Sequence, residues 1–281
     1  MKNLVIFALS IIFLLGNMSC SSEIGEGVST NIRQDSIALN NLNEQIQSIN
    51  NSYIQQDTRG LKKWLRWLIF GVADVGGYFL GDLGGAVAAS KLAWDMTKEE
   101  TNTKISNDAT IKENCLNLID TTSVGYLHNK YSFELLENYG DTLDTMSTSG
   151  LAKIVSDLIN RDHNYQINPT NVENILKGTR QKFDPNTGIR ENIENFKNLT
   201  NDELKKATLD ICGSVLEGLQ YIDDADTTYI PKVTKTIEDS DISPEVKQQL
   251  LDGISIANGS ALLWNSNQLS ERLKNAKNIH N

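Results

Sequence analysis

Residues 68–94 read LIFGVADVGGYFLGDLGGAVAASKLAW, and small side chains recur through this stretch at steps of four positions. The series consists of Ala73, Gly77, Gly81, Gly85, Ala89 and Ala93. Positions four apart lie on one face of a helix, and a row of small residues lets two helix backbones approach closely. Because each glycine in a helix interior costs about 1 kcal/mol relative to alanine, this density favours a tightly packed helix or helical hairpin.

The charges in this stretch bear on whether it enters a membrane. Asp74, Asp82 and Lys91 leave no uncharged run longer than eight residues, whereas a transmembrane helix needs roughly 18 or more. We therefore expect the stretch to pack within the protein. A second interpretation stays open, in which residues 61–94 enter a membrane conditionally, with the aspartates protonated or paired. The side chains that would then contact lipid headgroups are Lys62, Lys63, Trp64, Arg66 and Trp67.

The N-terminus has the organisation of a bacterial export signal. Lys2 precedes an apolar run from residue 4 to residue 15, which is the length of a secretory signal and too short for a bilayer span. The small residue before Cys20 resembles a lipobox, although Asn17 stands where an aliphatic residue is usual. We expect residues 1–19 to be a lipoprotein signal peptide and Cys20 to carry the lipid. The alternative is an ordinary secretory signal cleaved near the same place.

The residues after this cysteine indicate where the protein is held. Ser21, in place of an aspartate, resembles lipoproteins sent to the outer membrane, so we expect a cell-envelope protein that faces the periplasm or the exterior. Residues 20–35 are polar and contain glycine, which predicts a flexible tether. The diacylglycerol and palmitate chains would supply the membrane attachment, because each buried methylene contributes about 0.8 kcal/mol.

The acidic composition limits the partners. The chain has 26 basic and 36 acidic residues and a net charge of −10, and removal of Lys2 with the signal would make it −11. Nucleic-acid binding requires a basic surface, so we expect no nucleic-acid partner. An acidic body instead suits an envelope protein partner.

An amphipathic helix is predicted over residues 36–58. Its apolar residues recur at heptad spacing and are Leu39, Leu42, Ile46, Ile49 and Tyr53. They cover about two heptads, which is fewer than a confident coiled coil requires. This face packs either against the protein's own body or at a dimer seam, and the first alternative is favoured.

Residues 107–281 show helical periodicity throughout, with sparse β-branched alternation and four prolines in the whole chain. Thr200 and Glu203 have the spacing of a capping box, and Ser243-Pro244 suits the start of a further helix. The polar residues 97–107 separate this body from the glycine-rich segment at 59–96 and form a candidate domain boundary. The expected fold class is all-α, with a bundle-like multi-helix body and a glycine-rich helix or helical hairpin near the N-terminus.

Residues able to carry chemistry are few. His128 has no cysteine, aspartate or second histidine at metal-ligand spacing, so hydrogen bonding within the packed body is its expected role. Cys115 and Cys212 either form a disulfide or remain buried thiols. The sequence contains no catalytic motif, and we expect no metal, no cofactor and no enzymatic activity.

Three features follow one another in the first half of the chain. They are Trp64 with Trp67, the glycine-rich stretch 71–89 containing Asp74, and Val124-Gly125-Tyr126-Leu127-His128-Asn129. Their order resembles a group of uncharacterised Gram-negative bacterial lipoproteins and secreted proteins. The resemblance covers roughly residues 60–136 and implies no known activity, but it implies that His128 and Asn129 form a functional or structural lock.

Together these features predict a lipid-anchored cell-envelope protein that acts as a non-enzymatic interaction or structural module. Its acidic helical body would provide the binding surface. The alternative is a membrane-active protein, toxin-like or pore-forming, that uses residues 61–94.

Overall fold

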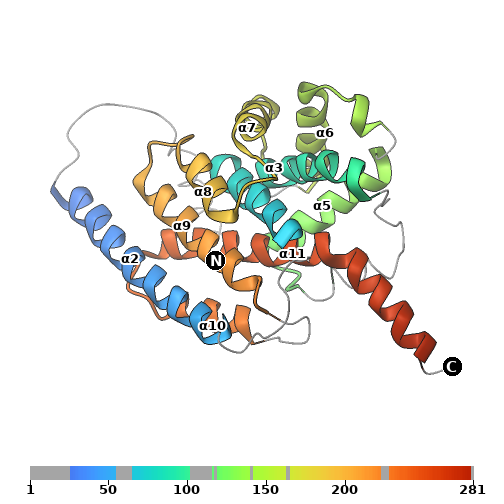
Figure 1. The fold of residues 1–281 in the computed structure, drawn as a ribbon. Coiled ribbons are helices and arrows are strands. Elements are labelled where there is room, and N and C mark those ends of the chain that lie inside the picture. The colour runs from blue at the N-terminus through green and yellow to red at the C-terminus, as the bar shows by residue number, and fades with distance from the viewer. Residues whose placement is uncertain are drawn as a thin grey trace, which may run out of the picture. The chain divides into compact units, whose positions relative to one another are not determined.

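The computed structural model of the chain describes residues 26–54, 65–101, 116, 119–139, 142–162, 165–222 and 228–279. Within these ranges it leaves out the side chains of residues 26–33, 65–67, 93–101, 144 and 265–279. Every regular element in the described ranges is a helix, and no strand occurs there (Figure 1). The prediction of an all-α multi-helix protein is therefore confirmed.

The described part of the chain contains the following helices. In chain order they are α2 (Glu26–Ile54), α3 (Leu65–Thr101), α5 (Val124–Tyr139), the 3-10 helix η1 (Leu143–Thr145), α6 (Thr148–Asn160), α7 (Pro169–Lys182), α8 (Ile189–Lys197), α9 (Glu203–Leu219), α10 (Tyr229–Glu238) and α11 (Pro244–Ile279).

α3 is a helical hairpin rather than one straight helix. Its backbone leaves the helical conformation at Gly81 and Asp82, which divide it into a first arm, residues 65–80, and a second arm, residues 83–101. Ser90 hydrogen-bonds Asp74, and the backbones of residues 77 and 85 are in contact. The higher-numbered residue of the first arm thus pairs with the lower-numbered residue of the second arm, so the two arms are antiparallel.

The small residues at steps of four sit where the hairpin arms and their neighbours come closest. A Cβ on Gly85 would overlap the carbonyl oxygen of Gly77, and a Cβ on Gly77 would overlap that of Gly85. Ala73 and Ala89 are buried beside this contact, at 0% and 1% exposure. Gly81 faces Ile175 of α7 instead. The side chain of Ala93, the last member of the series, lies outside the described part.

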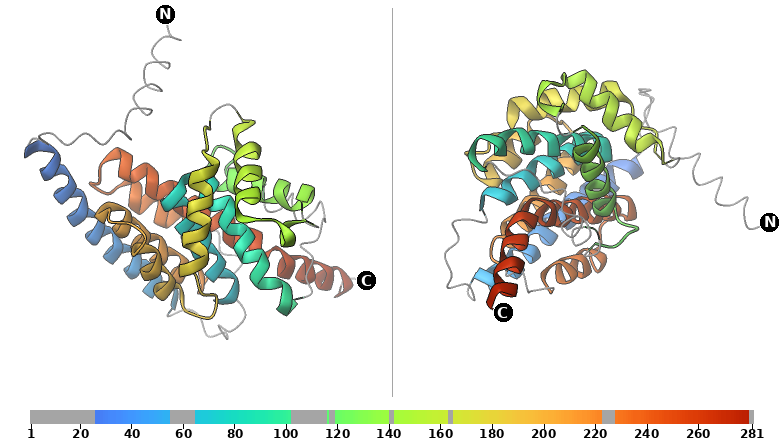
Figure 2. Two further views of the ribbon diagram at one scale, coloured as in Figure 1. Left: turned by 90° about the horizontal axis from the view of Figure 1, so that it is seen from above. Right: turned by 90° about the vertical axis from the view of Figure 1, so that its right-hand side faces the viewer.

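The hairpin is enclosed by the other helices of the unit formed by residues 34–281. Residues 68–77 and 83–92 are buried without a break, as expected of a helix that is apolar on all sides. Figures 1 and 2 show α3 between α7 on one side and α11 on the other, and α5, α6, α8 and α9 also pack against it. The candidate boundary at residues 97–107 is therefore wrong, because the hairpin supplies the core of the same compact unit as the later helices.

α2 uses its heptad face within the protein. Leu39, Leu42, Ile46 and Ile49 are 0–8% exposed and belong to the core cluster that includes the first hairpin arm. Tyr53, one heptad step further on, packs edge-on against Tyr229 of α10. The interpretation in which the helix packs on its own body is therefore correct.

The predicted flexible tether is too long. α2 begins at Glu26, so residues 26–35 are helical, and the part of the tether before Glu26 lies outside the described residues. The Asp35 carboxylate accepts hydrogen bonds from the backbone nitrogen and the hydroxyl of Ser243, both at 2.7 Å. This contact 208 positions away along the chain holds the first turns of the helix, and a local sequence pattern does not show it.

Two helix starts differ from the sequence prediction. The cap of α9 is Asp202, whose carboxylate accepts from the backbone nitrogens of Leu204 and Lys205. Thr200, expected in that role, instead accepts a hydrogen bond from the backbone nitrogen of Asp202. A carboxylate at the cap also interacts favourably with the helix dipole, which explains the shift of the start by two positions. Ser243-Pro244 does precede α11, but the serine hydroxyl binds Asp35.

Asp82, in the turn of the hairpin, is the one described non-glycine residue with a positive φ, 54° with ψ −159°. That region favours glycine, and other residues there are strained by about 1–3 kcal/mol. We expect Asp82→Gly to raise the free energy of unfolding by about 1 kcal/mol, measured by urea denaturation. Asp82→Ala keeps the strain and serves as the control. Equal stabilities of the two variants would contradict the strain at this position.

Candidate functional site

A buried carboxylate lies at the centre of the molecule. Asp74, on the first arm of α3, is 0% exposed and accepts three hydrogen bonds. Ser90 of the second arm donates to Oδ1 at 3.0 Å, while Ser260 and Trp264 of α11 donate to Oδ2 at 2.7 and 3.3 Å. His128 of α5 also faces Oδ2, with its Nε2 at 3.4 Å. The donors come from three parts of the chain, and together they compensate much of the desolvation of the charge.

The imidazole of His128 is held from both sides. Its Nδ1 is 2.9 Å from Oδ1 of Asn129, whose amide nitrogen donates to the Gly259 carbonyl at 2.9 Å. The amide oxygen must therefore accept, and Nδ1 carries a proton. Nε2 lies 2.9 Å from Ser90 Oγ, and that hydroxyl already donates to Asp74. Nε2 therefore lies within reach of both the Ser90 hydroxyl and the Asp74 carboxylate.

The order Ser90, His128, Asn129 resembles the nucleophile, base and orienting group of a hydrolase. Here, however, the serine proton is committed to Asp74, and the side chains of the cluster are 0–5% exposed. A substrate cannot reach a sealed hydroxyl. The arrangement joins the two hairpin arms to α5 and α11, and we name Asp74, Ser90, His128, Asn129, Ser260 and Trp264 the polar cluster.

Close helix packing brings His128 and Asn129 into the polar cluster. A Cβ on Gly125, one turn before them, would overlap the backbone carbonyl of Ser255 in α11. On the other side of this contact, a Cβ on Gly259 would lie 2.9 Å from the Gly125 carbonyl oxygen. The two glycines let α5 and α11 touch along their backbones. The Val-Gly-x-x-His-Asn motif thus combines a contact point with the two polar residues that it positions.

Sequence reasoning singled out Asp74, His128 and Asn129 but missed Ser90, Ser260 and Trp264. One signal was present in the sequence: an aspartate inside an apolar segment must find buried donors when that segment is enclosed. Ser90 is the first serine or threonine after Asp74 in the chain and lies on the facing arm. The two α11 donors are 186 and 190 positions away, and only the fold identifies them.

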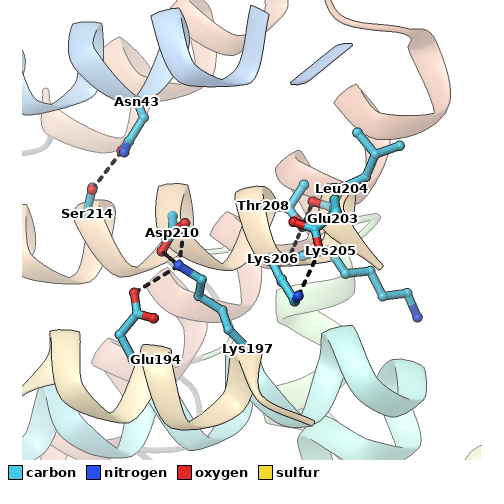
Figure 3. Close-up of polar contacts among 10 residues, drawn as sticks. All are labelled: Asn43, Glu194, Lys197, Glu203, Leu204, Lys205, Lys206, Thr208, Asp210 and Ser214. Atoms are coloured by element: carbon cyan, nitrogen blue, oxygen red, sulfur yellow. Dashed lines mark hydrogen bonds and ion pairs between the residues drawn. The ribbon is translucent and has the colours of Figure 1, made fainter. Parts of the chain in front are cut away.

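A cleft of about 260 Å³ opens on the surface between α2, α8 and α9. Two ion-paired groups border it. Arg190 donates to both carboxylate oxygens of Glu217 at 3.1 and 2.6 Å. Lys197 lies between Asp210 and Glu194, with its Nζ 2.8 Å from each carboxylate, and Figure 3 shows this arrangement.

Between these two groups the cleft is less polar. Ile193 and Gly213 line it there, together with Ser214, whose hydroxyl donates to Asn43 Oδ1 of α2 at 2.8 Å (Figure 3). A Cβ on Gly213 would lie 2.9 Å from Ile193, so α8 and α9 pack closely beneath the cleft.

The two cations of the cleft, Arg190 and Lys197, are protonated at neutral pH. Hydrogen bonding to Glu217, followed by its negative charge, raises the pKa of Arg190. Burial alone would lower the pKa of Lys197, but its hydrogen bonds to Asp210 and Glu194 outweigh this and raise it. The cleft therefore presents an ordered pattern of fixed positive and negative charges.

Several predicted site residues lie outside the described part of the chain. These are Cys20, Lys62, Lys63, Trp64 and Cys115, while Arg66 and Trp67 belong to α3 but their side chains are not described. Cys212 carries a free thiol that is 0% exposed, and burial raises its pKa. The other cysteine of the predicted disulfide, Cys115, lies outside the described residues, so the choice between a disulfide and two buried thiols stays a prediction.

Two further searches cover the described residues alone. They contain no group of three or more histidine, cysteine, aspartate or glutamate side chains arranged to hold a metal ion. None of their helices combines the length and the apolar character needed to cross a bilayer.

The fold and the polar cluster define an all-α protein built around an enclosed apolar hairpin that contains a buried carboxylate. Comparisons with protein-family models, with curated proteins and with solved structures found no match. The functional argument therefore depends on the geometry of this chain.

Proposed function

We propose that this is a lipid-anchored cell-envelope protein that works by binding a polypeptide partner in the cleft between α2, α8 and α9. The observation that carries the proposal is the cleft itself, because it combines fixed charges of both signs with a short apolar floor. The signal sequence ending at Cys20 and the acidic net charge support the location and the absence of a nucleic-acid partner. Binding rather than catalysis is the proposed activity.

The dimensions of the cleft suit a segment of polypeptide. Arg190 and Lys197 are seven residues apart on α8, which is about 10 Å along a helix. An extended segment of three to four residues, at roughly 3.3 Å each, spans that distance. Its ends would interact with the two ion-paired groups, and a small side chain would lie over Ile193 and Gly213. Arg190 is 68% exposed and is therefore accessible to a partner's carboxylate.

A charge swap separates recognition from stability. Arg190→Glu combined with Glu217→Arg keeps an ion pair but inverts its direction, so folding should change by less than about 1 kcal/mol. We expect the swap to lower partner capture about tenfold, because charge complementarity at the cleft is reversed. The measurement is the yield of complexes from envelope fractions with a photo-crosslinking residue at Asn43, and the same residue at exposed Gln249 is the control. Equal yields for the swap and the wild type would refute the cleft as the docking site.

The anchor is tested by membrane partitioning of the wild type and Cys20→Ala after high-salt and alkaline carbonate washes. The variant also carries a signal that signal peptidase I cleaves, so that an uncut apolar run cannot imitate anchoring. We expect the wild type in the membrane fraction and the variant in the soluble fraction, because several lipid chains hold firmly and a protein without them does not. A variant that remains with the membrane would show that another segment anchors the chain.

A further inference from the structure

We infer that the hairpin α3 is a releasable element whose partner is a lipid surface, and that the Asp74–His128 pair is the latch that keeps it inside the body. This proposal concerns a different part of the molecule from the cleft, and its test is independent of the proposed binding function.

The first step of the argument is the apolar character of the hairpin. Ten consecutive residues in each arm, 68–77 and 83–92, are buried. A helix that is apolar around its whole circumference suits a protein core or a lipid environment equally well. The 16 residues of the first arm, at 1.5 Å each, reach about 24 Å and do not cross the roughly 30 Å of a bilayer core. The hairpin would therefore enter the lipid surface without spanning the bilayer.

The second step is that the hairpin can move as a unit. Its arms touch backbone to backbone at Gly77 and Gly85 and are joined by the Ser90–Asp74 hydrogen bond, so we expect them to move together. The strained turn at Asp82 is at the molecular surface. The neighbouring residues Lys62, Lys63 and Trp64 are of the types that favour lipid headgroups.

The third step is the latch. Most contacts of the hairpin with the body are apolar and insensitive to solution conditions. The described polar contacts include those of Asp74, which is bound from α11 by Ser260 and Trp264 and faces His128 of α5. They also include the hydrogen bond from Tyr78 to Asp252 of α11. The loss of a buried partner leaves a charge uncompensated, so the docking of the hairpin depends on the charge state of Asp74.

A proton is the trigger that fits this latch, since protonated Asp74 has the charge of asparagine. The other described titratable groups nearby are His128 on α5, Lys91 next to Ser90 in the second arm, and Asp252 on α11, which Tyr78 binds. In the described part of the chain, no hydrogen bond or ion pair reaches Asp74 or His128 from α6, α7, α8 or α9. Burial raises the pKa of Asp252, so its protonation also contributes to a response to acid, and the part of the response that Asp74→Asn removes is the part that belongs to the pair.

Cys212 is a native reporter of hairpin release. A Cβ on Gly253 of α11 would lie 2.8 Å from the Phe79 ring and 3.0 Å from the Cys212 sulfur, so the hairpin and the thiol meet at this point. The mature chain with Cys20→Ala and Cys115→Ser contains Cys212 as its sole thiol. Labelling by a fluorescent maleimide then reports opening, and dye release from phosphatidylethanolamine–phosphatidylglycerol vesicles reports lipid insertion.

We expect Asp74→Asn to speed the labelling on the order of a hundredfold and to cause dye release at neutral pH. The parent chain, which carries only Cys20→Ala and Cys115→Ser, should be labelled quickly and should release dye only after acidification. Asp74→Asn should lose most of this acid response. Gly218→Ala is the matched control, because it destabilises the contact with Asn50 and Tyr229 and leaves the polar cluster intact. It should not release dye.

A disulfide staple tests the movement itself. The Cβ positions of Gly81 and Ile175 are 3.6 Å apart, within the range for a disulfide. In Asp74→Asn with Gly81→Cys and Ile175→Cys, the oxidised protein should not release dye and the reduced protein should. Dye release that persists with the staple closed, or that Gly218→Ala matches, would overturn the proposal. So would an Asp74→Asn protein that opens but leaves vesicles intact.

Discussion

Gly85→Ala is expected to lower the free energy of unfolding by about 3 kcal/mol or more. The added Cβ would overlap the carbonyl oxygen of Gly77, and a backbone atom cannot move aside as the end of a flexible side chain can. The two hairpin arms would have to separate, which would loosen the enclosed core on both sides of α3. Urea denaturation of purified protein measures the effect.

Gly178→Ala is the matched control for this variant. Gly178 also lies inside a helix, α7, but its Cβ would make only ordinary contacts, the nearest 3.6 Å from Leu199. Alanine has the higher helix propensity, so this variant should be stabilised by about 1 kcal/mol. If both substitutions changed stability by the same amount, the close approach of the hairpin arms would not be what requires Gly85.

His128→Ala is expected to cost about 3–5 kcal/mol, because it removes the imidazole that faces the buried Asp74 carboxylate and leaves that carboxylate less compensated. The expected loss also includes the hydrogen bond to Asn129, whose amide remains bound to the Gly259 carbonyl. Removing the charge of Asp74 at the same time should recover part of this loss. The double variant His128→Ala with Asp74→Asn should therefore be less destabilised than the sum of the single variants.

The control for this double-mutant cycle of His128 and Asp74 is an ion pair that also involves α5 but lies at the surface of the protein. Lys130 contacts Asp162 at 2.7 Å, with the two side chains 32% and 46% exposed. Exposed pairs contribute about 0–1 kcal/mol, so Lys130→Ala should have a small effect. Additive losses in the His128 and Asp74 cycle, measured by the same denaturation experiment, would show that the two buried residues are not coupled.

Local sequence patterns were sufficient for the class of fold and for several contacts. The helical periodicity after residue 107 and the small residues at steps of four depend on neighbours three or four positions away, which is the range that a helix imposes. For this reason the all-α class was predicted correctly, and the glycine contact at residues 77 and 85 was anticipated as close packing. The cap of α9 was misplaced because threonine and aspartate are both good caps, and their positions differ by two residues.

What the sequence by itself determined is that this chain is helical, acidic and built around an apolar, glycine-rich segment with an aspartate in it. The tertiary structure alone decided that the segment folds back on itself, that it belongs to the same unit as the later helices, and that Ser260 and Trp264 bind Asp74. It also decided that α2, α8 and α9 border one cleft. The physical reason is that these contacts depend on how whole helices pack, which no local pattern encodes. Some of them also join residues far apart in the chain, such as Asn43 with Ser214 and Asp74 with Ser260, which are 171 and 186 positions apart.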